Sequence, residues 1–309
     1  MLAALAATLP VAALAQAPTQ VGWPFALPDL PGNTRLRPLG GIEIDRGLLG
    51  FGGLSGLHLA PDLTVTAISD MARFAEFALV LDAGLRPSRL MLKRAGHLRD
   101  GAGRPLPRGY AGDAEALARL PDGSWLVAFE RWHRIRRYGD LDGPGAYVEA
   151  PPGLELAPAN GGLETLTVLE DGRWLAITEE MTPPEAPGLR MGWIGRPGAW
   201  GELAYRPGPF LVPVDAAPLP DGGALVLERG FSLLGGFWGR LVRLPASALV
   251  PGQVLEGEEL VSLESPLPVD NYEGLATLRH QGRQLVALVS DDNENRLQRI
   301  LLLLFELID

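Results

Sequence analysis

Two short apolar runs separated by a tight turn form a pattern that occurs five times along the chain. Each copy opens with small residues and ends its second run near an acidic residue. The positions that recur in the first runs are spaced 60, 49, 51 and 58 residues apart, and they are Ser55, Glu115, Glu164, Asp215 and Glu273. Each interval has room for four short strands, and four-stranded units repeated at this period are typical of a β-propeller.

The two ends of the chain complete this arrangement. The last unit has room for only three strands, the third of them over residues 296–307, and an apolar segment at 35–45 precedes the first unit. That segment is expected to add the missing outer strand and so remove two open sheet edges. The sequence therefore predicts an all-β fold, a β-propeller of five four-stranded blades closed by N- and C-terminal strands. The count becomes six if one copy is too weak to recognise.

Turn signals place the acidic residues in space. Asp122-Gly123, Asp171-Gly172 and Asp221-Gly222 lie midway between the paired acidic positions of three units, as expected for hairpins. Each acidic pair then lies across two strands, at the end opposite the turn. Because the first strand of a blade lines the channel, ten positions are expected at one channel mouth. Ser55 is one of them, and the other nine are acids: Asp70, Glu115, Glu130, Glu164, Glu179, Asp215, Glu228, Glu273 and Asp291.

Carboxylates crowded in this way need compensation, because like charges and partial burial both disfavour ionisation. Bound cations, arginines or protons can supply it, and oxygen-rich sites suit Ca²⁺ or Mg²⁺ better than zinc. We interpret the nine acids as candidate Ca²⁺ ligands. The alternative is a structural ring in which the acids accept backbone N–H bonds at the junctions between blades.

Positive side chains are expected at the same mouth. Arg73, Arg131 and Arg229 follow second-strand acids by three, one and one residues, and they either pair with the acids or hold the anion of a ligand. His133 lies close to Glu130 and is a candidate acid or base. Carboxylates mixed with arginines are what metal-assisted hydrolysis of an anionic ester requires.

Composition narrows the class of protein. The 309 residues include 27 Lys and Arg, 37 Asp and Glu and no Cys, and the net charge of −10 argues against nucleic acid as a partner. Residues 2–15 form an apolar run ending in Ala13-Leu14-Ala15, which is typical of a signal peptide. We therefore expect a leader at 1–15, an extension at 16–34 and the propeller at 35–309. The mature protein is expected in the periplasm or secreted, monomeric and without a membrane span.

The motifs resemble those of the bacterial phytase-like family, also described as having esterase-like activity of phytase. The resemblance rests on Gly-Leu-Ser-Gly-Leu at 53–57, Ile-Ser-Asp at 68–70, Gly-Leu-Glu-Thr-Leu at 162–166 and Asn-Tyr-Glu-Gly-Leu-Ala at 271–276. It covers about residues 35–309 and implies an exported propeller with calcium-dependent phosphoester hydrolysis.

Within this resemblance, the acids that match the repeat best are Glu115, Glu164, Glu273 and Asp291. The first three of these and His133 are the candidate catalytic residues. The chain departs from the pattern at Ala114, Ala116, Thr165 and Ala216-Ala217, and Lys93 is its single lysine, whereas propeller phytases have a lysine-rich phosphate pocket.

Two other functions fit the same pattern. A non-catalytic binding propeller predicts that every acid is bonded to backbone N–H groups. A lactonase- or glycosidase-like enzyme predicts two suitably separated carboxylates and an aromatic platform. A phosphate ester hydrolase instead predicts several arginines that converge near the metal.

Overall fold

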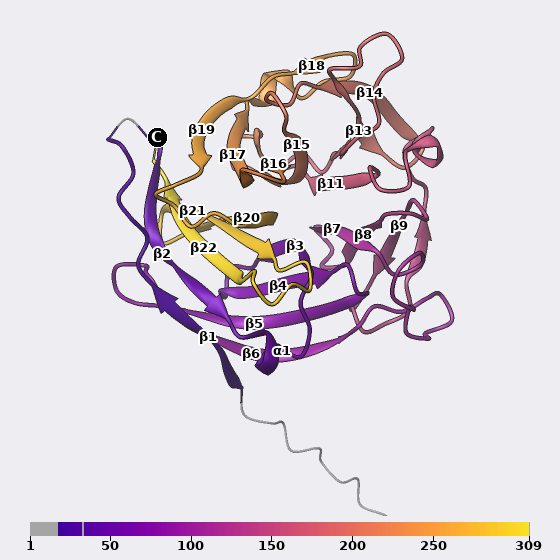
Figure 1. Ribbon diagram of the computed structural model, residues 1–309. Coiled ribbons are helices and arrows are strands. Elements are labelled where there is room, and N and C mark those ends of the chain that lie inside the picture. The colour runs from indigo at the N-terminus through magenta and orange to yellow at the C-terminus, as the bar shows by residue number, and fades with distance from the viewer. Residues whose placement is uncertain (1–17, 33, 309) are drawn as a thin grey trace, which may run out of the picture.

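A computed structural model describes residues 18–32 and 34–308, which form strands arranged around a common centre (Figure 1). The predicted leader at 1–15 lies outside the described residues, so export stays a prediction. Among the residues described, no helix is both long and apolar enough to cross a membrane. Within the described ranges the single α-helix is α1 (Arg46–Leu49), and two short 3-10 helices cover Leu154–Leu156 and Ala246–Ala248.

The strands form five blades, each ordered from an inner to an outer strand. The first blade contains β3 (Leu54–Leu59), β4 (Thr64–Ser69), β5 (Arg73–Leu81) and β6 (Pro87–His97). The second contains β7 (Ala114–Arg119), β8 (Trp125–Phe129), β9 (Arg134–Tyr138) and β10 (Ala146–Val148). The third contains β11 (Leu163–Val168), β12 (Trp174–Thr178), β13 (Arg190–Arg196), β14 (Ala199–Tyr205) and, parallel to β14, β18 (Val254–Leu255).

The remaining two blades complete the ring. The fourth contains β15 (Val212–Pro218), β16 (Ala224–Ser232), β17 (Gly236–Leu244) and β19 (Glu258–Leu263). The fifth contains β20 (Asn271–His280), β21 (Arg283–Asp291), β22 (Ile300–Leu307) and β2 (Leu36–Ile44). The inner strands β3, β7, β11, β15 and β20 contact one another in turn around the centre, which confirms the predicted propeller.

Segments from both ends of the chain close the ring. Strand β2 pairs with β22 in antiparallel register from Leu36 opposite Leu307 to Ile44 opposite Ile300, as the sequence predicts. Strand β1 (Thr19–Phe25) lies in the segment assigned to an extension and pairs with both β2 and β6. It therefore joins the fifth and first blades into one nine-stranded sheet.

The hydrophobic core is divided among the five junctions between neighbouring blades. Successive residues of a strand face opposite sides of its sheet, so each blade contributes to two junctions. In β4, for example, Ala67 packs with residues of the fifth blade, whereas the next residue, Ile68, packs with residues of the second. Burial of both faces of every blade holds the inner strands in place around the channel.

The Asp-Gly turns lie at the end of the blades away from the predicted mouth. Gly123, Gly172 and Gly222 have φ of 86°, 79° and 84°, a conformation that glycine adopts without steric cost. The Gly123 N–H donates to the Leu120 carbonyl (2.9 Å), and Gly172 and Gly222 make the equivalent bonds. The opposite ends of the same hairpins therefore gather at the other face of the ring.

Small residues allow the inner strands to approach closely near that face. A Cβ at Gly274 of β20 would lie 2.5 Å from the Ser55 carbonyl oxygen of β3. We expect Gly274→Ala to lower the free energy of unfolding by about 1–3 kcal/mol, because backbone must move to admit the methyl group. Urea unfolding measures the loss.

Gly139→Ala is the matched control, since a Cβ at that position meets no heavy atom within 4 Å. Equal effects of the two substitutions would contradict the close approach of β20 and β3.

Candidate functional site

Irregular pairing at the start of the inner strands directs acidic side chains into the channel mouth. The register between the first two strands of a blade shifts between Ala114 and Ala116, between Leu163 and Thr165, and between Tyr272 and Gly274. The extra residue of each bulge is Glu115, Glu164 or Glu273, and a bulge re-aims its side chain. These three glutamates are accordingly half-buried rather than packed between blades.

The second strands place further acids beside them. Asp70, Glu130 and Glu179 each follow the last residue of a second strand, and Asp291 is the last residue of β21. Their positions are fixed by backbone bonds: the Glu130 N–H donates to the Asp113 carbonyl (2.8 Å) and the Glu179 N–H to the Gly162 carbonyl (2.9 Å). Asp70 is held likewise by the Gly53 carbonyl (3.0 Å).

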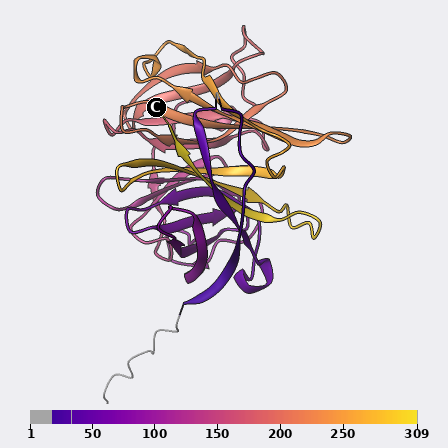
Figure 2. The ribbon, with the colours of Figure 1, turned by 90° about the vertical axis from the view of Figure 1, so that its left-hand side faces the viewer.

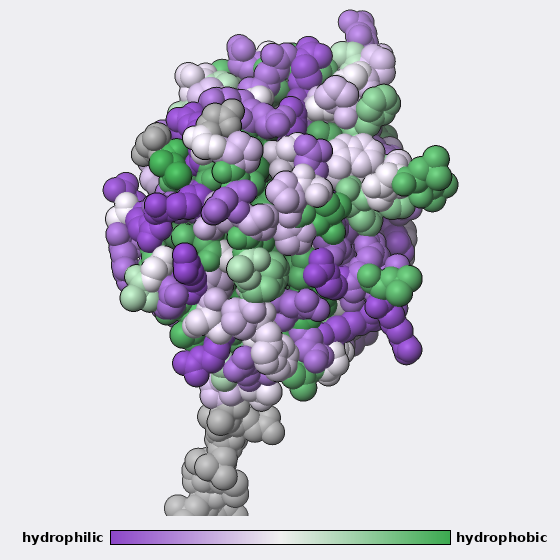
Figure 3. Space-filling model, turned by 60° about the vertical axis from the view of Figure 1, so that its left-hand side comes forward, coloured by the Kyte–Doolittle hydropathy of each residue, from purple (hydrophilic) through white to green (hydrophobic). Residues whose placement is uncertain are grey.

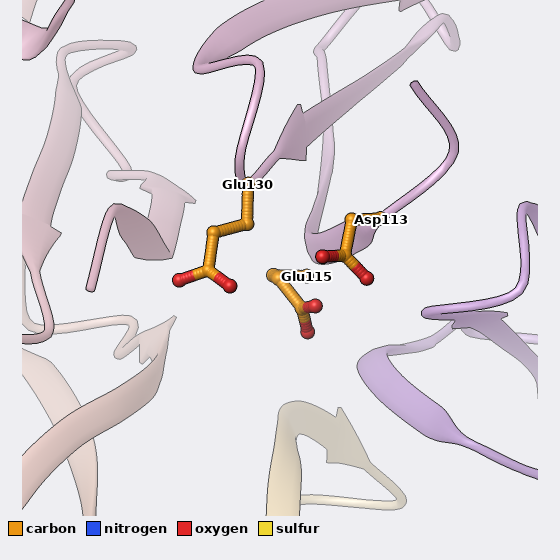
Figure 4. Close-up of side chains that lie close together, drawn as sticks. All are labelled: Asp113, Glu115 and Glu130. Carbon is orange, nitrogen blue, oxygen red and sulfur yellow. The ribbon is translucent and has the colours of Figure 1, made fainter. Parts of the chain in front are cut away.

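Two groups of three carboxylates meet closely enough to share a cation. Asp113, Glu115 and Glu130 form one group, and Glu130, Glu164 and Glu179 form the other, with one oxygen of each residue within 4.8 Å of the others. Figure 4 shows the first group, in which Asp113 comes from the segment before β7 and Glu130 from the end of β8. Glu130 belongs to both groups and is largely buried.

Sequence reasoning did not select Asp113, although it stands two residues before Glu115 in an extended segment. The full set, here called the acidic cluster, joins both groups to the acids that interact with them electrostatically. Its members are Asp70, Asp113, Glu115, Glu130, Glu164, Glu179, Glu273 and Asp291.

Arg229 is the cation that binds two members of this cluster at once. Its Nη1 donates to Glu273 Oε1 and to Asn271 Oδ1, both at 2.8 Å, and its Nη2 donates to Glu179 Oε1 at 3.0 Å. Asn271 also donates to Glu273 Oε1 (2.8 Å), so this part of the cluster is tied together. The guanidinium is thus committed to the acids, the first of the two roles expected of it.

The structure corrects the predicted places of Asp215 and Glu228. Pro213 pairs with Glu228 and Asp215 with Leu227, so Val214 and Arg229 occupy the positions that acids hold in the other blades. Asp215 is buried and accepts from the N–H groups of Leu275 (2.7 Å) and Ala216 (2.8 Å). Glu228 is buried and accepts from Arg240, Tyr205 and the Gly208 N–H. Both acids therefore stabilise contacts in the blades, as the structural alternative predicts for them.

The remaining predicted residues lie around the cluster. Arg131 Nε contacts Asp113 Oδ2 at 2.6 Å. His133 Nε2 lies 3.2 Å from the Ala157 carbonyl and 3.0 Å from that of Pro158, so it donates to the loop before β11. Arg73 forms no ion pair with an acid in 18–32 or 34–308, and its Nε donates to the Gly96 carbonyl (3.1 Å).

A pocket rich in arginine adjoins the cluster on the same face. Its cavity, of about 940 Å³, is lined by Arg46, Arg73, Arg108 and Arg296, here called the arginine pocket, together with Glu294. Arg46 pairs with Asp292 and Glu294, and Arg108 pairs with Glu294. Arg73 and Arg296 form no ion pair with a described residue, so the pocket keeps excess positive charge. Arg46 begins helix α1, Arg108 and Arg296 lie in two separate loops, and no sequence pattern links the three.

Burial and mutual repulsion raise the pKa values of the cluster. Burial, with the charges of Glu273 and Asp113, raises the pKa of Asp70 to about 7. Burial is also the main cause that raises the pKa of Glu130 to about 7 and that of Asp291 to about 9. The pKa values of Glu115 and Glu164 are well above the ordinary range for the same reason. Near neutral pH, several of these groups hold protons unless a cation replaces them.

We expect the metal-free protein to lose stability as the pH rises from about 4 to about 9. A carboxyl with a raised pKa in the folded state contributes most below its unfolded pKa, and this contribution is lost as pH rises through the folded pKa. The measurement is the melting temperature in chelator across this range. A melting temperature that rises steadily with pH would contradict the raised pKa values of Asp70, Glu130 and Asp291.

Removal of the Arg229 charge is expected to be costly. Arg229→Met leaves Glu179 and Glu273 without their cation in a largely buried setting, which lowers the free energy of unfolding by about 3–5 kcal/mol. Chemical unfolding in chelator measures this loss, which grows as pH rises. Arg206→Met serves as the control, because Arg206 pairs with Glu256 at the surface, where such pairs contribute about 1 kcal/mol or less. Equal losses in the two variants would refute the assigned role.

Several solved structures are similar to this chain over most of its length. An aldose sugar dehydrogenase from Streptomyces coelicolor, solved with PQQ, is 16% identical, with 94% of this chain and 99% of that chain covered and a TM-score of 0.44. A gluconolactonase from Xanthomonas campestris is 13% identical, with 95% and 99% covered and a TM-score of 0.45. A thermostable family-43 glycoside hydrolase is 9% identical, with 82% and 89% covered and a TM-score of 0.50. Only the glycoside hydrolase reaches a TM-score of 0.5, and at 9% identity its similarity supports the fold alone.

The sequence itself matches one family. No curated protein sequence matches the chain. The profile of the family described as "Phytase-like: Esterase-like activity of phytase" matches residues 49–294, which include all five inner strands. That span is well over half of the chain, and the chain therefore belongs to the phytase-like family.

Proposed function

We propose that this chain hydrolyses an anionic ester, with Ca²⁺ held by the acidic cluster and the anion held by the arginine pocket. The observation that carries the proposal is the presence of these two sites side by side on one face. Burial raises the pKa values of Asp70 and Asp113, and Arg108 lies near enough to offset part of that rise. Arg73 pairs in the hairpin that carries Asp70. Arginines that converge beside a metal site favour a substrate with a phosphate or carboxylate group, because a neutral substrate offers them no charge to bind.

The donor set of the cluster fits a hard cation. The two groups of three offer carboxylate oxygens, with Glu130 common to both, and Ca²⁺ prefers several oxygen ligands in flexible geometry. The raised pKa values of Glu115, Glu130 and Glu164 point the same way, because a cation relieves the repulsion that protons otherwise relieve. Asp113, Glu130, Glu164 and Glu179 are the residues we assign to hold it. When bound, Ca²⁺ supplies a Lewis acid that stabilises negative charge developing on the ester.

The other residues have distinct roles in this proposal. Glu115 borders the channel and accepts no hydrogen bond from the described residues, so it is our candidate to take a proton from the attacking water. Glu273 is fixed by Arg229 and Asn271 and orients its neighbours. His133 anchors the loop at 157–158 through its Nε2 and is assigned to positioning that loop rather than to acid–base chemistry.

One observation favours a second candidate, a lactonase- or glycosidase-like hydrolase. Tyr110 and Trp132 are both exposed on the mouth face and stack with their planes 9° apart and centroids 6.4 Å apart. Such a platform suits the face of a sugar ring, and Trp132 directly follows Arg131. The carboxylates of the cluster would then act on a substrate without a phosphate.

The test is a hydrolysis screen of the purified protein with p-nitrophenyl phosphate, p-nitrophenyl acetate, a γ-lactone and p-nitrophenyl glycosides. We expect turnover of an anionic ester in Ca²⁺ and its loss in chelator. Glu115→Gln and Glu130→Gln should each lower kcat by 10²-fold or more, on the scale of general-base loss. Glu180→Gln, an exposed acid next to Glu179 but outside both groups of three, should keep full activity.

Arginine variants in the same screen separate the candidates. Arg73→Gln and Arg296→Gln should raise KM for the anionic ester with little change in kcat, because the lost contacts stabilise the bound substrate and the transition state equally. If the protein hydrolyses a lactone or glycoside and neither substitution changes the rate of that hydrolysis, the second candidate is favoured. Activity that is unchanged in chelator and in Glu130→Gln would refute the metal-assisted mechanism.

A further inference from the structure

Large apolar side chains are exposed on the mouth face, beside the acidic cluster. Strands β16 and β17 extend beyond the fourth blade as a long hairpin, and the loop between β21 and β22 projects to the same side (Figure 2). Phe231 of the hairpin is 55% exposed and Leu297 of the loop is 92% exposed. Hydrophobic side chains project at the corresponding right-hand edge of the surface in Figure 3.

A cleft of about 750 Å³ lies between this hairpin and this loop. Its apolar lining consists of Phe231, Phe237, Val269 and Leu297, here called the apolar cleft, and the rings of Phe231 and Phe237 lie 4.7 Å apart. Arg229 also lines the cleft, and the same guanidinium binds Glu179 and Glu273. The apolar cleft is thus continuous with the acidic cluster through one side chain.

Both walls of the cleft are held in place. The hairpin is paired without interruption to Ser232 opposite Gly236, and the Gly235 N–H donates to the Ser232 hydroxyl (2.9 Å). In the loop, the Asn293 N–H donates to Asp291 Oδ1 (2.8 Å) and the Gln298 N–H donates to the Asn295 carbonyl (3.0 Å). A preformed cleft with apolar walls and a few polar groups is the usual form of a small-molecule site.

The loop also connects the apolar cleft with the arginine pocket. Asn293 and Leu297 line the cleft, whereas Glu294 and Arg296 line the arginine pocket. This loop therefore has a cationic site on one side and apolar side chains on the other.

We infer that the substrate is an amphipathic anionic ester, whose charged group binds in the arginine pocket and whose hydrocarbon part binds in the apolar cleft. This inference rests on the proposed function and narrows its substrate class. The occupant is a small ligand because the apolar cleft is continuous with Arg229 and bounded by two fixed walls.

The test uses alkylphosphonates, which carry the anionic group but have no ester bond to hydrolyse. Calorimetry in Ca²⁺ compares methyl-, butyl- and hexylphosphonate. We expect affinity to rise about fourfold per methylene, the equivalent of about 0.8 kcal/mol for each buried CH₂. In the variant with Phe231→Ser and Leu297→Ser, affinity for methylphosphonate should persist and the dependence on chain length should disappear.

Tyr147→Ser is the control, because the exposure of Tyr147, 76%, lies between those of Phe231 and Leu297, but Tyr147 lies on β10, the outer strand of the second blade. Melting temperatures check that the variants fold. Equal affinities for methyl- and hexylphosphonate, or no binding of hexylphosphonate at millimolar concentration, would overturn the inference. Adsorption to phosphatidylcholine vesicles through Leu233 and Leu234 with no dependence on alkyl length would also overturn it and place this edge against lipid.

The two proposals fail in different ways. If affinity depends on chain length but no alkyl phosphate is hydrolysed, the apolar cleft is supported and the hydrolase is refuted. Turnover of alkyl phosphates that is indifferent to chain length supports the hydrolase and refutes the apolar cleft.

Discussion

Repulsion among carboxylates at the channel mouth is the interaction on which the organisation of this face depends. Eight acids from four blades meet there, and burial raises the pKa values of its members. Arg229 neutralises part of that negative charge, because it binds Glu179, Glu273 and Asn271 at once. Protons or a bound cation must neutralise the remaining negative charge. The stability of the fold and the proposed chemistry therefore depend on the same excess of negative charge.

The packing of the blades decides which acids share this excess. In the inner strands, the residue after each bulge packs against the next blade, and it is Ala116, Thr165 or Gly274. The bulge residue before it faces the channel instead. In the fourth blade an acid, Asp215, occupies the packed position, and it is tolerated there because it accepts the Leu275 N–H of the fifth blade. An acid that is shifted by one residue along its strand thus packs between blades as a structural residue instead of facing the channel mouth.

Much of this was accessible from the sequence, because the repeat and the Asp-Gly turns carry register information. The five blades and the closure of β2 on β22 follow from spacing alone. The sequence prediction misplaces Asp215 and Glu228, because they are the acids nearest to the expected site positions of the fourth unit. In the second and third units the site residues lie seven before and eight after the Asp of the turn, and the same count from Asp221 gives Val214 and Arg229. Arg46, Arg108 and Arg296 have no such signal, since they lie in helix α1 and two unrelated loops that only the closed ring brings together.

The asymmetry of the fourth blade shapes the mouth as a whole. With Val214 and Arg229 in place of two acids, both groups of three carboxylates fall on the second and third blades. The same blade carries the long β16–β17 hairpin, so apolar surface stands next to the side from which carboxylates are missing. A ring of equivalent blades would present one uniform acidic mouth, suited to cations alone. The departure of the fourth blade from the repeat instead leaves apolar surface beside the acids. Together with the arginine pocket, the mouth then offers the three regions that our proposed substrate, an amphipathic anionic ester, requires.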